Sequence, residues 1–475
     1  MVDKAAMGGL FRRKPVSLEE LPDHQRLAAT LSWWHLIPLG VGAIVGTGIY
    51  ALIGVGVNLA GPAIILSFVI AGAVCACAAL AYAEVATVIP ASGSAYTYSY
   101  AVLGEIIAWV VGWSLILEYS LVASAVAVGW SGYAVGALNG AGVHLPQALS
   151  AGFWAGGLVN VPAIVIIAIV SGALMLGTRE SATVNGFLVG VKILALLVFI
   201  AVAALHFKAS NLRPFDPYGF VGPVTGGKRH GVMAAAAIMF FAFYGFDALS
   251  TAAEETRRPG RDLPVGIVGS MVICTALYIA VATVAVGAAP FQTFANSPEP
   301  LAVILRGVGE GGMAFMIAGA AVVAIPTVIL AFLYGQSRIF FVMARDGLLP
   351  ARLARVNAVT RTPVRMILVT AIAVGALAGL APLDQIAALA NAGTLVAFIA
   401  VSACLLVLRV RAPDQPRIYR APLAWVIGPG AIVGCLYLFW NLQLETKVFF
   451  SAWTLLGVAA YAAWRVGRRR PSPAA

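Results

Sequence analysis

Three ionisable side chains interrupt long apolar runs of this sequence, and each could place a charge far from water. Lys192 lies in VNGFLVGVKILALLVF, Glu118 in WSLILEYSLVA, and Asp247 in FFAFYGFDALS. Such a charge is costly, so these residues are expected to face protein groups or a cavity. The lysine could bind and release a proton, and a carboxylate could contact a ligand or relay a proton. The alternatives are purely structural roles: the lysine extends its side chain to the nearest water, and the carboxylates accept hydrogen bonds from the backbone or cap a helix.

Two glycine-containing segments could also bind a ligand through their main-chain groups. GVGAIVGTGI runs from Gly40 to Ile49, and FFAFYGFD runs from Phe240 to Asp247. Glycine costs about 1 kcal/mol in a helix relative to alanine, so these segments indicate either close helix packing or a break in the helix. A break would expose free N–H groups on one half-helix and free carbonyls on the other, which suit a carboxylate and an ammonium group. A dinucleotide-binding loop is excluded because no strand precedes the glycines.

The elements that must position these residues are apolar helices. The chain has 475 residues, of which 61% are hydrophobic and 10% charged, whereas soluble proteins carry about 25% charged residues. The apolar runs are long and continuous, which favours helices over the short alternating strands of a barrel. We therefore predict an all-α polytopic membrane protein. The five cysteines lie within apolar runs and are interpreted as packing residues, with no metal site or disulfide framework.

Apolar runs of spanning length, or close to it, recur about twelve times along the chain. The predicted spans are Leu36–Val57, Ala63–Val88, Ile106–Leu138, Val159–Leu176, Val184–Leu205, Val232–Ala253, Val265–Ala288, Met313–Met343, Met366–Leu380, Ile386–Leu408, Leu423–Asn441 and Val448–Tyr461. The two glycine segments fall in the first and sixth spans. The sixth span is five positions after the first, and a repeat of five helices, an odd number, must insert with the opposite orientation, so a substrate site is predicted where the interruptions cross.

The net charge of +11 is explained by membrane orientation. Most Lys and Arg residues lie on one side if the N-terminus is cytoplasmic, as the positive-inside rule requires. This distribution predicts no nucleic-acid partner. Glu254 and Glu255 are expected to pair with the arginines of the following turn, RRPGRDLP.

Four strings resemble the amino acid–polyamine–organocation transporter superfamily, and in particular its cationic amino acid transporter branch with its bacterial relatives. They are GVGAIVGTGIY (Gly40–Tyr50), AYAEVATVIPASGSAYTYSY (Ala81–Tyr100), FFAFYGFDALSTAAEET (Phe240–Thr256) and YGQSRIFFVMARDGLLP (Tyr334–Pro350). The resemblance implies a LeuT-type fold of two inverted five-helix repeats and two further helices. The expected divisions are a cytoplasmic segment 1–34, a first repeat 35–206, an extracellular loop 207–231, a second repeat 232–408, two helices in 409–465 and a cytoplasmic tail 466–475.

The same resemblance implies roles for individual residues. Substrate contacts would come from the two breaks and from neighbouring helices, at Ile44, Gly46, Thr47, Gly48, Phe241, Ala242, Tyr244, Glu118 and Phe332. The bulk of Phe332 would favour small neutral substrates and puts transport of arginine or lysine in doubt. Lys192 would face the first helix and couple transport to protons, where sodium-coupled relatives bind a cation.

These features together predict a secondary active transporter that takes up L-amino acids with protons by alternating access. We expect a multi-pass protein of the bacterial cytoplasmic (inner) membrane with both termini cytoplasmic, amino acid and proton as ligands, membrane lipid around it, and no cofactor. An exchanger or uniporter, including one for cationic amino acids, and a non-transporting amino acid sensor remain alternatives. An enzyme is not predicted, because no nucleophile, metal or cofactor motif is present in the sequence.

Overall fold

The computed structural model describes residue 13 and residues 31–89, 93–176, 182–225, 228–250, 256–349 and 364–469. Its α-helices are α1 (Trp33–Ile44), α2 (Thr47–Tyr50), α3 (Leu52–Ala60), α4 (Ile64–Val88), α5 (Ser94–Val102), α6 (Glu105–Gly140), α7 (Gln147–Ser150), α8 (Val161–Met175), α9 (Ala182–Leu205), α10 (Val232–Met239), α11 (Phe246–Ser250), α12 (Pro259–Ala288), α13 (Pro300–Gly307), α14 (Gly311–Ala324), α15 (Pro326–Arg345), α16 (Val364–Leu380), α17 (Leu383–Arg411), α18 (Ala424–Asn441) and α19 (Leu444–Arg469). Short 3₁₀ helices are η4 (Gly61–Ala63), η5 (Phe153–Ala155), η6 (Ala209–Leu212), η7 (Phe240–Phe243) and η9 (Phe291–Thr293), and the strands β1 (Val224–Thr225) and β2 (Lys228–Arg229) pair antiparallel.

The described residues form nine helices that are long and apolar enough to cross a membrane, and three shorter apolar helices. The shorter helices are Trp33–Ile44, Val161–Met175 and Val364–Leu380. Each predicted apolar run overlaps at least one of these twelve helical regions, because hydrophobicity is a local property of the sequence. The prediction of an all-helical polytopic membrane protein is confirmed.

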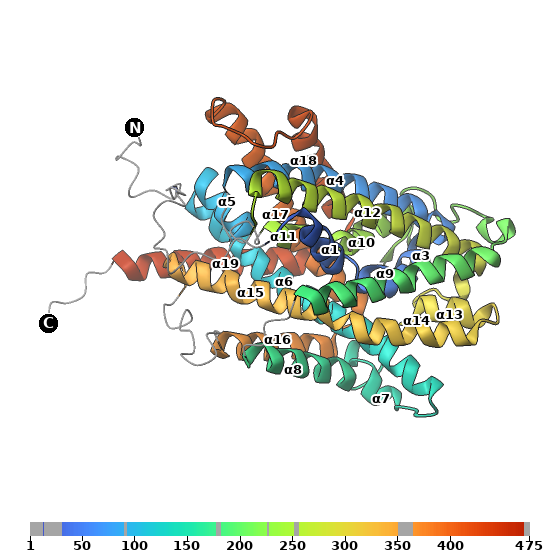
Figure 1. The fold of residues 1–475 in the computed structure, drawn as a ribbon. Helices are drawn as coiled ribbons and strands as arrows, with labels where there is room; N and C mark the ends of the chain where they lie inside the picture. Colours follow the sequence, from blue (N-terminus) through green and yellow to red (C-terminus); the bar gives the residue numbers. More distant parts are fainter. Residues whose placement is uncertain are drawn as a thin grey trace.

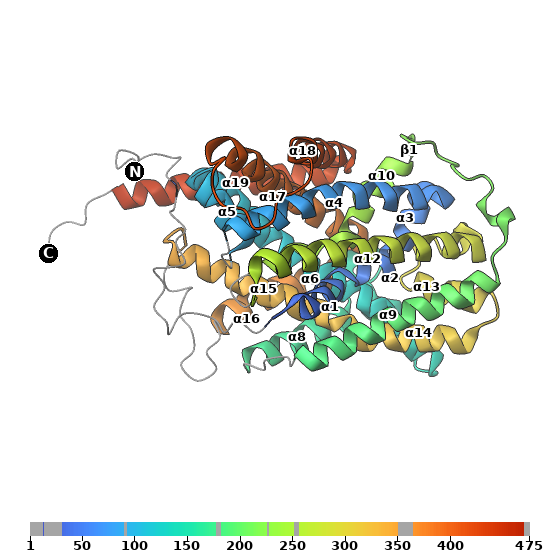
Figure 2. The ribbon, with the colours of Figure 1, turned by 45° about the horizontal axis from the view of Figure 1, so that its top comes forward.

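The long helices lie roughly side by side along one axis of the molecule (Figure 1). Helix α5 and the C-terminal parts of α15 and α19 lie at one end, whereas α3, α7 and α13 lie at the other. Helices α1, α10 and α11 occupy the middle of the bundle, and α1 packs against α12 in the turned view (Figure 2). The region Val232–Ser250 is 94% buried within its most apolar window, against 22% to 61% for the other long spans. Irregular backbone is tolerated at such a depth because protein, rather than lipid, surrounds it.

Three of the predicted spans are divided in the structure: the first and sixth are interrupted as predicted, whereas the division of the eighth corrects the prediction. Leu36–Val57 is divided into α1, α2 and α3, and the last of these continues to Ala60. Val232–Ala253 is divided at the end of α10 and again after η7, and its last three residues lie outside the described part, as do Glu254 and Glu255. Met313–Met343 divides into α14 and α15 at Pro326, whose ring nitrogen has no hydrogen to donate to the preceding turn.

Candidate functional site

The first break separates α1 from α2. Val45 ends α1 in an extended conformation with φ −74° and ψ 103°, and Gly46 follows with φ −155° and ψ −147° before α2 begins. No described residue accepts a hydrogen bond from the amides of Gly46, Thr47 or Gly48. These free N–H groups are the ones that the first turn of a helix leaves without intrahelical partners.

The second break lies between α10 and α11. Helix α10 tightens into η7, Tyr244 is extended, and Gly245 has φ +110° before α11 starts. Asn391 of α17 bonds this segment from the side: its Nδ2 donates to the carbonyls of Ala237 and Ile238 at 2.6 Å and 3.2 Å, and its Oδ1 accepts from the Tyr244 hydroxyl. The amide therefore satisfies backbone groups beside the break and fixes the Tyr244 ring.

Two glycines bring the breaks into direct contact. A Cβ on Gly245 would lie 2.6 Å from the carbonyl carbon of Ala43 in α1. A Cβ on Gly48 would lie 2.4 Å from the Cα of Ala242 in η7. Backbones can approach this closely only where side chains are absent. The prediction that both helices are interrupted at their glycines is confirmed, and so is the prediction that the interruptions cross.

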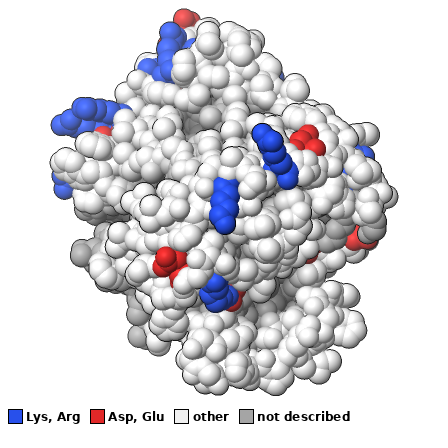
Figure 3. Space-filling model, turned by 90° about the vertical axis from the view of Figure 1, so that its right-hand side faces the viewer, with Lys and Arg blue, Asp and Glu red and all other residues white. Residues whose placement is uncertain are grey.

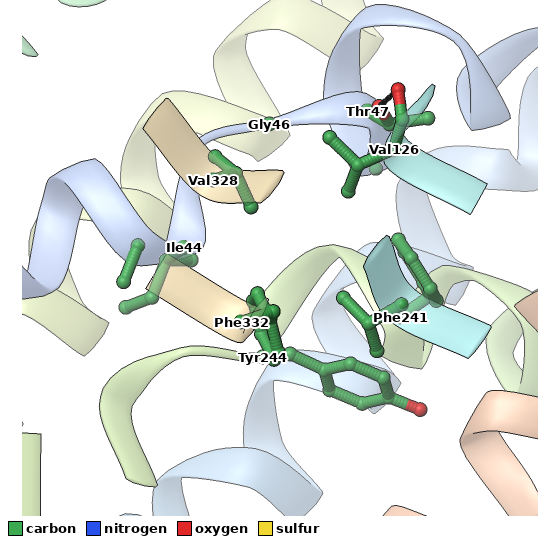
Figure 4. Close-up of a pocket in the computed structure, with 11 residues that line it drawn as sticks. Ile44, Gly46, Thr47, Val126, Phe241, Tyr244, Val328 and Phe332 are labelled. Atoms are coloured by element: carbon green, nitrogen blue, oxygen red, sulfur yellow. Dashed lines mark hydrogen bonds between the residues drawn. The ribbon is translucent and has the colours of Figure 1, made fainter. Parts of the chain in front are cut away.

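A small cavity lies at this crossing (Figure 4). It measures about 10 Å³, which is close to the space that one water molecule needs. Its lining comes from α1, α2, α6, η7 and α15: Ala43, Ile44, Gly46, Thr47, Gly48, Val122, Val126, Phe241, Tyr244, Val328 and Phe332. A cavity of this volume is too small for an amino acid, so a ligand of that size requires movement of the lining side chains.

Polar groups reach this cavity from both halves of the first broken helix. The Ile44 carbonyl at the end of α1 accepts a hydrogen bond from the Tyr278 hydroxyl at 2.9 Å and keeps a second lone pair. Thr47 donates through Oγ1 to the carbonyl of Val126 at 3.3 Å, the contact drawn in Figure 4. Donors and acceptors of the main chain thus flank a space whose remaining walls are apolar.

Seven of the nine residues predicted to contact substrate line this cavity, and two do not. Ala242 packs behind it against Gly48. Glu118 is 1% exposed and lies against α17, where a Cβ on Gly393 would be 3.2 Å from the Glu118 Cβ. Neither carboxylate oxygen of Glu118 has a hydrogen-bond partner among the described residues.

Asp247 is hydrogen-bonded close to its own break. Its carboxylate accepts from the amide of Gly245 at 3.2 Å and from the Tyr119 hydroxyl at 3.3 Å. These bonds match the capping interpretation, in which the side chain of Asp247 stabilises the turn that leads into α11.

Lys192 faces α1 and is completely buried. Its Nζ donates to the carbonyl of Gly42 at 3.0 Å and to the Thr327 hydroxyl of α15 at 2.8 Å. The Tyr50 hydroxyl bonds the Lys192 carbonyl at 3.0 Å. Lys192 therefore does not snorkel to the surface, and it ties α9 to both halves of the first broken helix.

Sequence reasoning missed four lining residues, Ala43, Val122, Val126 and Val328, and also Asn391. The valines carry a signal that could have found them: Val122 and Val126 follow Glu118 at intervals of four residues, and Val328 precedes Phe332 by four. Residues at this spacing share one face of a helix. Asn391 stands out as a polar side chain within an apolar run, but its partners are distant in sequence.

A bundle of apolar spanning helices that encloses a central cavity between two broken helices defines a membrane transporter of the helical type. The chain belongs to the amino acid permease family, whose model matches residues 31–462. The predicted membership of the amino acid–polyamine–organocation superfamily is confirmed, and members of this family are transporters rather than enzymes.

Relatives match nearly the whole chain. The branched-chain amino acid permease BcaP of Bacillus subtilis is 45% identical over 460 residues, which covers 96% of this chain and 97% of the relative. The methylthioribose transporter of the same organism is 40% identical over 459 residues, covering 96% and 97%. The vacuolar cationic amino acid transporter 4 of Arabidopsis thaliana is 36% identical over 421 residues, covering 86% and 68%.

Proposed function

We propose that this protein is a secondary active transporter that takes up neutral amino acids by alternating access. The observation that carries the proposal is the set of unpaired amides at Gly46, Thr47 and Gly48, which borders the same cavity as the carbonyl of Ile44. A half-helix N-terminus attracts a carboxylate, and free carbonyls attract an ammonium group. A zwitterionic α-amino acid matches both ends of this arrangement.

The walls of the cavity favour an apolar substrate side chain. Val122, Val126, Val328 and Phe332 line it, and none of the lining residues carries a charge. A cationic substrate would lose its hydration without gaining an anionic partner, since Glu118 does not belong to the lining. The Bacillus subtilis relative is named for branched-chain amino acids, and the Arabidopsis relative is named for cationic ones. Of these two substrate classes, the uncharged lining favours the first.

Two inverted five-helix repeats are the proposed architecture behind alternating access. Residues 35–206 and 232–408 would form the repeats, 207–231 an extracellular loop, and 409–465 two additional helices. The breaks in α1–α2 and in α10–α11 lie at matching places in these halves, which supports the assignment.

Protons are the proposed coupling ion, and Lys192 is the proposed carrier. A lysine without contact to water can exist in a neutral form, and its Nζ contacts the Gly42 carbonyl one turn before the first break. Protonation would therefore be sensed by the segment that holds the substrate. Exchange or uniport with a permanently charged Lys192 is the alternative, and a sensor without transport is a more distant one.

The bacterial cytoplasmic membrane is the proposed location, with both termini in the cytoplasm. Support comes from the basic residues, which concentrate toward the predicted cytoplasmic side. The opposite end of the molecule shows few basic and acidic side chains on a largely uncharged surface (Figure 3).

Binding and uptake test the proposal together. The purified chain is melted in the presence of each of the twenty amino acids. We expect branched-chain and other small neutral amino acids to raise Tm, and lysine and arginine to leave Tm unchanged.

Proteoliposomes are then loaded at pH 7.5 and diluted to pH 6.5 with a radiolabelled amino acid that raised Tm. Accumulation above the external concentration supports symport. Equilibration without accumulation identifies a uniporter, and uptake only into substrate-loaded vesicles identifies an exchanger.

A further inference from the structure

A second cavity lies between the start of α1 and the start of α12, apart from the proposed substrate site. It is half open and measures about 210 Å³, and its lining residues are Ser32, Trp33, Trp34, Arg257, Arg258, Arg261 and Asp262. The backbone holds the two walls together, because the amide of Arg257 donates to the carbonyl of Leu31 at 2.8 Å. The cavity is therefore a fixed feature of this helix junction, formed by segments more than 200 residues apart in the sequence.

The charge of this cavity is strongly positive. Arg257, Arg258 and Arg261 are all exposed, and none of them forms an ion pair with a described residue. The acidic lining residue is Asp262, which is 4% exposed. The buried carboxylate of Glu84 pairs with Arg409 and Arg417, and not with the arginines of this cavity. Three guanidinium groups around one hollow form an anion site, and guanidinium matches phosphate oxygens with two parallel hydrogen bonds.

Two tryptophans indicate the depth of the cavity in the membrane. Trp33 is 41% exposed and Trp34 is 61% exposed, and their ring centroids lie 5.6 Å apart. Exposed tryptophans at the ends of spanning helices sit at the level of lipid headgroups. The arginines and these rings therefore meet where the phosphates of a bilayer lie.

We propose that this cavity binds a phosphate-bearing anion, supplied by the headgroup of an anionic membrane phospholipid. Arg257, Arg258 and Arg261 bind the phosphate, and Trp33 and Trp34 cover the glycerol and the upper acyl chain. Basic pockets between helices on the cytoplasmic side bind anionic headgroups in this way. A bound headgroup connects α12 to the beginning of α1, the helix that carries the first break.

This link reaches the proposed substrate site through closely packed helices. A Cβ on Gly266 of α12 would lie 2.6 Å from the Leu36 Cβ, and one on Gly269 would lie 3.2 Å from the Ile37 Cδ1. Because side chains of α1 pack directly against these glycines of α12, a restraint at the ends of the two helices acts on both as a unit.

The test uses the full chain, delipidated in a neutral detergent, and reads binding by the shift in Tm without any amino acid substrate. Wild type is titrated with phosphatidylglycerol, with phosphatidylcholine and with inorganic phosphate. The site variant is R257Q/R258Q/R261Q. The matched control is R365Q/R411Q/R420Q, which removes three other exposed arginines and the same amount of charge.

We expect phosphatidylglycerol to raise the Tm of wild type and of the control, and phosphatidylcholine to raise neither. The site variant should need at least tenfold more phosphatidylglycerol for the same shift. Inorganic phosphate distinguishes the sources: a lipid site responds weakly to it, whereas a site for a soluble phosphate compound shows the same arginine-dependent shift with phosphate alone. If the triple variant does not fold, R258Q replaces it against R411Q, and a several-fold weakening is expected.

Three results would overturn the proposal. The first is an equal response to phosphatidylglycerol and phosphatidylcholine. The second is an equal loss in the site variant and the control, which would show attraction to overall positive charge. The third is no shift with either anion, the outcome expected if Glu254 and Glu255, outside the described residues, neutralise the arginines.

Discussion

Replacement of Lys192 by methionine is the sharpest test of proton coupling. Methionine has a similar length but carries neither a charge nor a donor. With one proton per amino acid, a gradient of one pH unit provides about 1.4 kcal/mol, which supports at most roughly tenfold accumulation. K192M should lower this ratio to about one, because no group remains to carry the proton, while exchange of substrate across the membrane continues.

The structural cost of K192M follows from the loss of the Nζ hydrogen bonds to Gly42 and Thr327. The Gly42 carbonyl loses its donor, since the break prevents the usual intrahelical bond, and an unpaired buried acceptor costs about 1–3 kcal/mol. Thr327 keeps its own bond to the carbonyl of Ala324 at 2.7 Å. The variant should therefore fold with a lowered Tm.

Accumulation is measured in proteoliposomes with the membrane potential clamped to zero. Thr327→Val is the matched control, because it removes the second partner of Nζ but leaves the lysine and its bond to Gly42. We expect the control to accumulate substrate. If K192M accumulates substrate as wild type does, Lys192 does not carry the proton.

Three other substitutions follow from the geometry. Gly245→Ala combines a φ of +110° with a Cβ 2.6 Å from the Ala43 carbonyl carbon, which should cost about 2–5 kcal/mol of stability and lower Tm strongly. The control Gly172→Ala, whose Cβ would have no atom within 4 Å, should cost no stability. Equal Tm values for the two variants would contradict the crossing of the breaks. Phe332→Val enlarges the cavity, so phenylalanine should begin to compete with leucine for uptake; an unchanged competition order would remove Phe332 from the substrate site. Burial raises the pKa of Glu299 although Arg306 pairs with it. Folding therefore favours the protonated form, and this contribution to stability is present below the ordinary pKa and is lost as pH rises through the folded-state value. The decrease in Tm over that range should shrink in Glu299→Gln, and an identical pH profile would argue against it.

Much of the candidate site follows from local sequence. Glycine raises the cost of a continuous helix wherever it occurs, so the segments around Gly46 and Gly245 could be identified as candidate breaks, with close helix packing as the alternative. Lys192 could be assigned to the protein interior because its position in an apolar run is too far from water for its side chain to reach. The resemblance added the order of these motifs, and with it seven of the residues that line the cavity.

The position of Glu118 shows where that reasoning ends. Sequence places it on the same face of α6 as Val122 and Val126, yet only the valines line the cavity, and the Cβ of Glu118 packs against Gly393 of α17 instead. Which residues of α6 line the cavity depends on how α6 and α17, distant in sequence, pack together, and no local sequence pattern determines that packing.

The sequence by itself determined that the chain forms apolar spanning helices and which two of them contain glycine segments able to break. Both outcomes depend on hydrophobicity and backbone freedom, which act within a few residues. Only the tertiary structure decided that Asn391 holds Tyr244, that Lys192 bonds Gly42 and Thr327, and that three arginines at or just before the start of α12 meet two tryptophans of α1. These contacts arise when helix faces from distant segments pack, and packing depends on the shapes of all the partners at once.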